Sequence, residues 1–330
     1  MIASVTRGDL IDLTYEGHIA VSDADGKLLY SQGDPTRLTF ARSSTKPFQA
    51  ATAILSGAVD AYGIDEEEIA LMCGSHTGTP QHLHVLTRLM DKASLTEDLL
   101  QCGAHAPFDR AARKALSSPP SALHNNCSAK HAGMLMSAKY MKEDLSTYTD
   151  LHHPHQQRIT HLLSELCDAP LDLFRYGIDG CGVPVHALPL HMFATAFARL
   201  SRPDSLRPDL RDALLRVAAA MRTFPVMVSG NGFICTMLME HFSDRLVAKG
   251  GANAFYAVSL PKQGWGLVIK VESGTASLLP GILLYALKDL GVIEDHEMDP
   301  FRSMMQEEIK NHRGDVVGRT RYHIDLQVKR

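Results

Sequence analysis

The stretch Ala41-Arg42-Ser43-Ser44-Thr45-Lys46-Pro47-Phe48 sets the fold and the chemistry that we expect of this chain. Residues 49–56, which follow it, are mostly small and apolar, as is typical of a helix packed against a core. Pro47 is tolerated in a helix only in the first turn, where its missing N–H is not needed. This places Ser43 at or just before the helix start, where a serine is a favoured N-cap.

Ser43 and Lys46 are three residues apart, so a helix would present them on one face. They would also lie at the helix end where free N–H groups and the helix dipole favour negative charge. A hydroxyl, an amine and an anion-stabilising helix start are the parts of an acyl-transfer site. The same spacing also arises when a serine caps a helix and a lysine is solvated, so the rest of the chain must decide.

Composition narrows the classes of protein that fit. The chain has 330 residues, of which 45% are hydrophobic and 21% charged, as in ordinary globular proteins. The net charge of -4 gives no electrostatic basis for a nucleic-acid partner, and no apolar run approaches the ~20 residues of a membrane span. Because there is no basic start followed by an apolar block, and six cysteines are too sparse for a disulfide framework, we expect a cytoplasmic protein.

Alternating segments near both ends predict strands. Residues 17–30 alternate around Asp25-Gly26, which indicates a hairpin, and residues 255–260 and 265–272 form a second alternating pair. Lys249 would lie on a strand just before that pair, followed by two glycines that permit close approach of a ligand. Helices are expected at 65–72, 81–92, 203–223 and 278–290, and a last strand pair within 314–330.

Two polar stretches interrupt the helical patterns in the first half. Residues 73–80 contain Ser75, a second candidate hydroxyl, and His76, a candidate hydrogen-bonding neighbour; the alternative is a connector whose glycines supply turns. Residues 124–133 begin a helix expected to run through Met141, capped by Asn125 or Asn126.

A metal site is one interpretation of the cysteines. Cys127, with Lys130 or His131, could meet Cys181 of the glycine-rich loop 176–184 on a metal ion. Two isolated cysteines lack the tight paired spacing of a structural zinc site, and spacing alone favours two buried free thiols.

Five motifs together carry a resemblance to a known family. Arg42-Ser43-Ser44-Thr45-Lys46-Pro47, Cys73-Gly74-Ser75-His76, residues 126–133, residues 179–184 and Lys249-Gly250-Gly251 occur in this order. The chain thereby resembles the Rhizobium-type L-asparaginases, the asparaginase II or class 3 family, over essentially its whole length. The resemblance implies an α/β fold similar to serine β-lactamases and penicillin-binding proteins, in which an antiparallel sheet is flanked by helices with a helical subdomain.

Lys249-Gly250-Gly251 of this chain looks like the Lys-Thr/Ser-Gly strand motif of the β-lactamases, with glycine in place of the hydroxyl residue. One catalytic unit would span 1–330, with the sheet made by the N- and C-terminal parts around a helical middle. The resemblance also implies site residues, as follows: catalytic pairs Ser43 with Lys46 and Ser75 with Lys249; substrate-binding Arg42, His76, His131, Asp179 and Gly251; and a zinc ion on Cys127, Lys130 and Cys181.

The implied reaction is hydrolysis of L-asparagine to L-aspartate and ammonia. Ser43 would attack the side-chain amide, Lys46 would accept its proton, and Ser75 and Lys249 would relay protons or bind substrate. Two alternatives remain: another Ser–Lys amidohydrolase, acting on β-lactams or glutamine, and a non-catalytic amino-acid-binding module. We expect a homodimer, with no nucleic acid, membrane or organic cofactor as partner.

Overall fold

Two hairpins from opposite ends of the sequence build the central sheet. The computed structural model describes residues 1–329. Within them the strands β3 (Gly17–Asp23) and β4 (Leu28–Gln32) form the first expected hairpin, and β9 (Phe255–Leu260) and β10 (Trp265–Val271) form the second. β10 pairs with β3 in an antiparallel register, so the N- and C-terminal parts share one sheet. In spatial order the six strands are β13 (Gln327–Val328), β4, β3, β10, β9 and β8 (Val247–Gly250).

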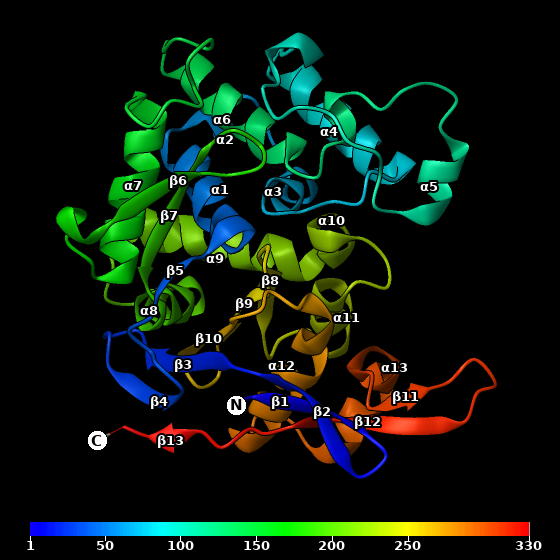
Figure 1. The fold of residues 1–330 in the computed structure, drawn as a ribbon. Coiled ribbons are helices and arrows are strands. Elements are labelled where there is room, and N and C mark those ends of the chain that lie inside the picture. The colour runs from blue at the N-terminus through cyan, green and yellow to red at the C-terminus, as the bar shows by residue number, and fades with distance from the viewer. Residues whose placement is uncertain (330) are drawn as a thin grey trace.

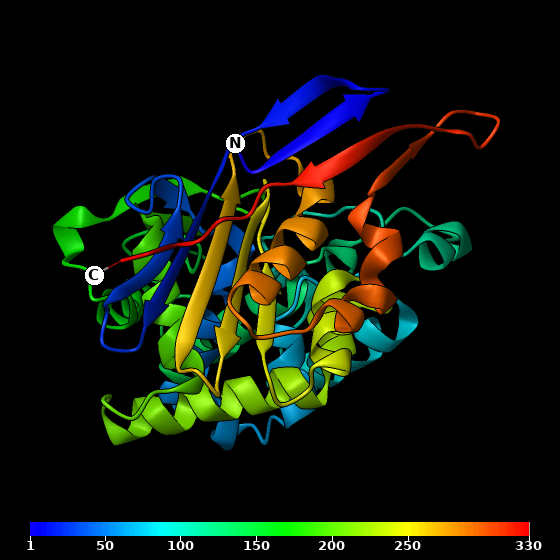
Figure 2. The same ribbon diagram turned by 90° about the horizontal axis from the view of Figure 1, so that it is seen from below.

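Helices cover both faces of this sheet. α8 (Leu190–Ser201) packs across β3, β9 and β10, and α12 (Leu279–Asp289) lies on the opposite face, as Figures 1 and 2 show from two directions. The inner strands of the sheet are therefore buried on both sides: every residue of β9 is buried. The expected antiparallel sheet flanked by helices is confirmed.

The middle of the chain is largely helical and lies above the sheet in Figure 1. The helices there and in the C-terminal part are α1 (Lys46–Leu55), α2 (Ala58–Ala61), α3 (Glu66–Met72), α4 (Pro80–Lys92), α5 (Arg110–Ala115), α6 (Ser128–Tyr140), α7 (Pro154–Cys167), α9 (Pro208–Thr223), α10 (Pro225–Ser229), α11 (Ile234–His241) and α13 (Arg302–Met305). The 3-10 turns are η1 (Arg42–Thr45), η2 (Glu97–Leu99), η3 (Ala122–His124), η4 (Leu171–Leu173), η5 (Ala276–Leu278) and η6 (Asp295–Phe301).

Two smaller sheets complete the fold. One has the order β11 (Glu308–Lys310), β12 (Val316–Tyr322), β1 (Ala3–Arg7), β2 (Leu10–Tyr15), and the other has the order β5 (Leu38–Phe40), β7 (Pro184–Pro189), β6 (Arg175–Ile178). The prediction of a strand pair within 314–330 is wrong in its pairing. β12 pairs with β1 and β13 pairs with β4, because a connection of four residues lets the chain pass from one sheet to the next.

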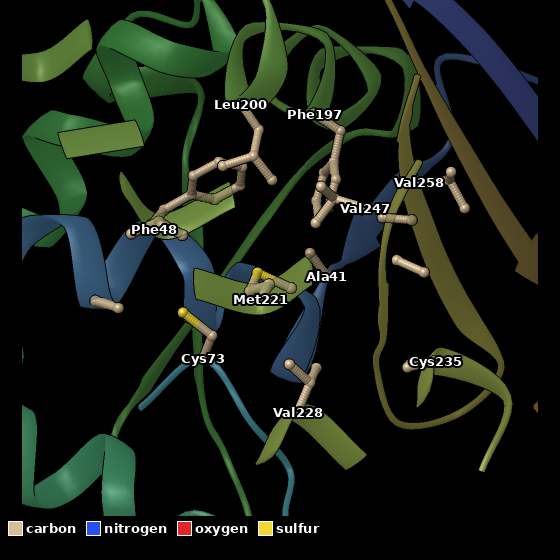
Figure 3. Close-up of a cluster of buried hydrophobic side chains, with 14 of the residues drawn as sticks. Ala41, Phe48, Cys73, Phe197, Leu200, Met221, Val228, Cys235, Val247 and Val258 are labelled. Atoms are coloured by element: carbon tan, nitrogen blue, oxygen red, sulfur yellow. The ribbon is translucent and has the colours of Figure 1, made fainter. Parts of the chain in front are cut away.

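The stretch around Ser43 forms a tighter turn than expected. η1 precedes α1, Thr45 is the N-cap of α1, and no side-chain capping bond is present there. Ser43 is thus inside a 3-10 turn, and the prediction that it caps the helix is wrong. Pro47 does lie in the first turn of α1. Phe48 then anchors the helix: its ring lies 5.3 Å from that of Phe197 in α8, and Figure 3 shows both within the buried cluster.

Other caps follow the sequence more closely. Asp65 caps α3 in a reciprocal capping box with Glu68, as expected. For α6 the cap residue is Cys127 and not an asparagine, although the Asn125 side chain accepts the Cys127 N–H at 2.8 Å. No helix among the described residues has both the length and the apolar character needed to span a membrane.

Candidate active site

One hydroxyl lies between two buried amines. Ser75 Oγ is 3.0 Å from Lys46 Nζ and 3.1 Å from Lys249 Nζ. Both lysine side chains are 1% exposed, so these amines exchange water contacts for protein contacts. The result is a continuous hydrogen-bonded path from one amine through the hydroxyl to the other, which is an arrangement that can move a proton.

Three separate elements bring these side chains together. Lys46 is the first residue of α1, Ser75 is in the loop between α3 and α4, and Lys249 is in β8. The loop is held to α10 because the Ser75 N–H donates to the Val228 carbonyl at 2.8 Å. The preceding Gly74 permits this approach, since a Cβ there would lie 2.4 Å from the Met227 carbonyl oxygen.

Backbone carbonyls hold the amines in place. Lys46 Nζ also donates to the carbonyls of Gly74 at 2.7 Å and Asn126 at 3.1 Å, and Lys249 Nζ donates to the Gly250 carbonyl at 2.8 Å. Neither motif spacing nor composition pointed to these carbonyls. Main-chain acceptors depend on how loops fold back, which a residue pattern does not encode.

Burial makes both amines easier to deprotonate. It lowers the pKa of Lys249 to about 8, and repulsion from the Lys46 cation acts in the same direction. Burial also lowers the pKa of Lys46, and the nearby Lys130 cation adds to that effect. A neutral amine near neutral pH is what a general base requires.

The structure does not show the expected direct contact between Ser43 and Lys46. Among residues 1–329 the Ser43 hydroxyl has no hydrogen-bond partner, and the link between the two residues is the Lys46 N–H donating to the Ser43 carbonyl. Lys46 Nζ is hydrogen-bonded to Ser75 instead, so in this structure both lysine amines contact the Ser75 hydroxyl. The reason is that spacing fixes the positions of the backbone atoms, whereas four rotatable bonds decide where a lysine amine goes.

Arg42 and Asp179 form a partly buried ion pair. Arg42 Nη2 and Nε lie 2.6 and 2.9 Å from one Asp179 carboxylate oxygen. Although burial raises the pKa of Asp179, the hydrogen bonds from Arg42 outweigh it and the net shift is downward. Arg42 has a left-handed backbone, with φ of +53°, which for an arginine is uncommon and turns its side chain toward the 179–183 loop.

The two histidines that were predicted to bind substrate are buried, and each is hydrogen-bonded to a neighbouring side chain. His76 Nε2 is hydrogen-bonded to Ser128 Oγ at 2.8 Å and its Nδ1 accepts the Gly78 N–H, which leaves no ring nitrogen free for a substrate. His131 Nδ1 contacts Tyr148 Oη at 2.6 Å, while its Nε2 has no partner among the described residues. Both side chains are fully buried.

Cys127, Lys130 and Cys181 come together, as the resemblance implied. Lys130 Nζ lies 2.8 Å from Cys181 Sγ, and all three residues are at most 6% exposed. A hydrogen bond from Cys181 lowers the pKa of Cys127, so a thiolate is favoured there. No group of three His, Cys, Asp or Glu side chains that could hold a metal is present in the described residues, so a lysine would have to be the third ligand.

Gly251 lies where β8 meets η1. A Cβ at this position would be 2.5 Å from the Ala41 carbonyl oxygen and 3.0 Å from Ser44 Oγ. Gly251, Lys249 and Ser75 also line a cleft of about 620 Å³. Most of the other lining residues were not predicted from the sequence, because they come from separate elements and share no motif.

The fold and this cluster define an α/β protein with a hydroxyl–amine site at the edge of an antiparallel sheet. The family model described as L-asparaginase II matches residues 3–322, so the chain belongs to the L-asparaginase II family. It is therefore an asparaginase-type amidohydrolase, and a small molecule is its substrate. No curated protein matches this chain.

Several solved structures are distantly similar. A structure of Mglu is 14% identical with a TM-score of 0.46, and the match covers 84% of this chain and 67% of the Mglu chain. In a second Mglu structure the match covers 63% of the Mglu chain. A β-lactamase from Mycobacterium bovis is 16% identical with a TM-score of 0.40, covering 83% and 94%. A class C β-lactamase from Rhodobacter sphaeroides is 12% identical with a TM-score of 0.41, covering 82% and 94%.

Proposed function

We propose that this protein hydrolyses L-asparagine to L-aspartate and ammonia through an acyl-enzyme. The observation that carries the proposal is the Lys46–Ser75–Lys249 path, because it supplies a base and a proton donor beside one cleft. The L-asparaginase II family match supports an amide substrate.

In the first step Ser43 attacks the amide carbon and Lys46 accepts its proton. Ser43 is three residues before Lys46 at the start of α1, where the first N–H groups lack helical partners and can stabilise an oxyanion. The Lys46 amine would move from Ser75 toward Ser43 to make this contact, since catalytic hydrogen bonds are often loose without substrate. Ser75 and Lys249 then deliver a proton to the departing nitrogen, and water hydrolyses the ester.

Arg42 and Asp179 are proposed to bind the α-carboxylate and α-amino groups of the substrate. Their charges match those of an amino acid, and their ion pair keeps both ionised at the edge of the site. His76 and His131 would act by holding the surrounding loops.

We also propose a zinc ion on Cys127, Lys130 and Cys181. Two sulfur donors and one nitrogen, brought together in a buried site, suit zinc, which takes thiolate and nitrogen ligands. Burial lowers the pKa of Lys130, but electrostatic attraction to the Cys127 and Cys181 sulfurs outweighs it and the net shift is upward, so metal binding would have to displace a proton. When bound, zinc would fix the two loops and offer an electrophilic centre near Lys46.

The experiment compares ammonia release from asparagine by three serine variants. Ser43→Ala should lower kcat by roughly 10³-fold or more, as removal of a nucleophile does, and Ser75→Ala by roughly 10²-fold, as loss of a proton relay does. Ser56→Ala, at the other end of α1, is the control and should stay near wild type. Near-normal turnover by Ser43→Ala would show that Ser75 is the nucleophile, and no ammonia from the wild-type protein would overturn the proposed function.

Two further properties are proposed. A homodimer is supported by edge strand β2, where Leu10, Ile11 and Leu13 are 77%, 60% and 49% exposed; a monomeric mass by light scattering would refute it. A cytoplasmic location is supported by six free cysteines; an intramolecular disulfide in protein from its own cells would argue against it.

A further inference from the structure

The cleft beside Ser75 and Lys249 is mostly apolar. Its apolar lining residues include Phe108, Phe233, Ile234, Leu279, Pro280 and Met304. The two phenylalanines come from separate segments, and their side chains are 49% and 42% exposed. Phe108 stacks on His105 at 4.8 Å, and His105 in turn is hydrogen-bonded to the Asn126 main chain next to the site. The apolar walls are thus joined to the catalytic loops.

The space is far larger than ammonia needs. The cleft measures about 620 Å³, whereas a molecule the size of water or ammonia occupies about 30 Å³. Volumes of this order usually hold ligands with several apolar groups. A substrate with nothing beyond its carboxamide nitrogen would leave the apolar side chains in contact with water.

The groups assigned to the amino-acid end of the substrate lie elsewhere. Among the described residues that line the cleft, neither Arg42 nor Asp179 is present. Those two come from η1 and the loop between β6 and β7, whereas the apolar walls come from α11, α12, α13 and the segments just before α5 and α11. In Figure 1, β6 and β7 lie to one side of β8 and α11 and α13 to the other. Ser75 and Lys249 line the cleft, so a group carried by the nitrogen that they protonate in the proposed reaction would face it.

We propose that the enzyme also hydrolyses asparagine derivatives whose amide nitrogen carries an apolar group, with that group in the cleft between Phe108 and Phe233. This inference rests on the proposed function of the same site. The carbon–nitrogen bond breaks as before: the Ser43 proton passes to Lys46, and the nitrogen leaves as an amine after receiving a proton through Ser75. Water then adds across the ester, so the products are L-aspartate and the apolar amine.

The test measures hydrolysis of the β-anilide of L-aspartic acid against hydrolysis of L-asparagine. The wild-type protein should cleave the anilide with a kcat/KM at least equal to that for asparagine. Phe233→Ala should lower kcat/KM for the anilide about tenfold, since a phenyl group loses an apolar contact, and change that for asparagine less than about twofold. Leu215→Ala, a similarly exposed apolar residue on α9 outside the cleft, is the matched control and should change neither. Phe108→Ala repeats the test from the opposite wall.

The outcomes separate this inference from the function on which it rests. Turnover of asparagine with no turnover of the anilide would overturn the inference and leave the asparaginase proposal intact. An equal loss for both substrates in Phe233→Ala would also overturn it, because the ring would then contact the shared amino-acid part. Absence of turnover of either substrate would overturn both proposals.

Discussion

Lys249 Nζ lies 3.1 Å from Ser75 Oγ, although the two residues are 174 positions apart in the chain. The contact closes the site between the sheet and the helical middle, since β8 provides the amine and the loop after α3 provides the hydroxyl. Because Lys249 is 1% exposed and has no carboxylate among its hydrogen-bond partners in the described residues, its charge is poorly compensated. Stability is therefore expected to have been given up for reactivity at this position.

The Lys249→Met variant tests whether the buried charge of Lys249 lowers the stability of the protein. Burial lowers the pKa of Lys249 from 10.5 to about 8 in the folded protein. Between these two values the unfolded chain binds more protons than the folded one, so the free energy of unfolding should rise with pH through that window. Below pH 8 the folded protein carries the charged amine at a cost. Lys249→Met should therefore unfold at higher urea concentration at pH 7, with a gain of up to about 3 kcal/mol, while losing amidase activity.

Urea unfolding of both proteins at pH 7 and pH 9.5 checks this expectation. The gap between variant and wild type should shrink at the higher pH, as the wild-type amine loses its proton. Lys262→Met, on the exposed turn between β9 and β10, is the matched control and should show no such pH-dependent gap. A constant gap, or a destabilised Lys249→Met protein at pH 7, would mean that the Lys249 amine is well accommodated when charged.

A double-mutant cycle tests the Arg42–Asp179 pair. Their side chains are 24% and 13% exposed, so each charge depends on the other and on the substrate. Arg42→Gln and Asp179→Asn should each lower kcat/KM for asparagine roughly 10- to 100-fold, mainly through KM, and the double variant should be little worse than either single one. Glu272→Gln, in a more exposed ion-pair group with Arg37, is the control, with an expected change below about twofold.

Additive losses in that cycle would contradict a joint role, because the two groups would then act independently. An unchanged KM in both single variants would remove them from substrate binding. The steady-state constants for asparagine decide between these outcomes.

The order of the five motifs predicted the family and the fold, whereas the local geometry expected at a single motif was less reliable. The hairpins at 17–30 and 255–272 and the capped helix at Asp65 follow from alternation and turn chemistry, which depend on neighbours in sequence. The family resemblance brought Cys127, Lys130 and Cys181 into one set, and the structure places Lys130 beside Cys181. No residue spacing could have joined Lys130 in α6 to Cys181 in the loop between β6 and β7, 51 positions further along the chain.

The features of the site that the sequence did not predict depend on contacts between segments that are distant in the chain. The Lys46 amine donates to the Gly74 and Asn126 carbonyls, and these come from two loops that are 52 positions apart and share no motif. For the same reason the apolar cleft had no sequence signature: Phe108 and Phe233 are 125 positions apart, and each is unremarkable in its own segment.

Zinc content is expected to depend on the two cysteines near Lys130. Purified wild-type protein should contain about one zinc ion per chain, and Cys127→Ala and Cys181→Ala should each lower zinc affinity at least about 100-fold, because each removes one of few ligands. Plasma emission spectrometry of dialysed protein measures this directly. Cys167→Ala, at a buried thiol in α7, is the matched control and should retain zinc. Equal zinc content in all four proteins, or none in the wild type, would refute the site.

The end of β8 packs closely against the turn that carries Ser43. In Gly251→Ala the new methyl group would lie 2.5 Å from the Ala41 carbonyl oxygen, closer than van der Waals contact allows, and that oxygen accepts the Ser44 N–H within the turn. Backbone atoms must therefore separate, at an expected cost of about 1–3 kcal/mol in stability. Asparagine turnover should fall more than tenfold, because the displaced turn carries Ser43 and leads into Lys46. Gly180→Ala is the matched control: a Cβ there meets no atom within 4 Å, so stability and kcat should stay near wild type. Wild-type activity in Gly251→Ala would show that catalysis does not depend on this approach of β8 to η1.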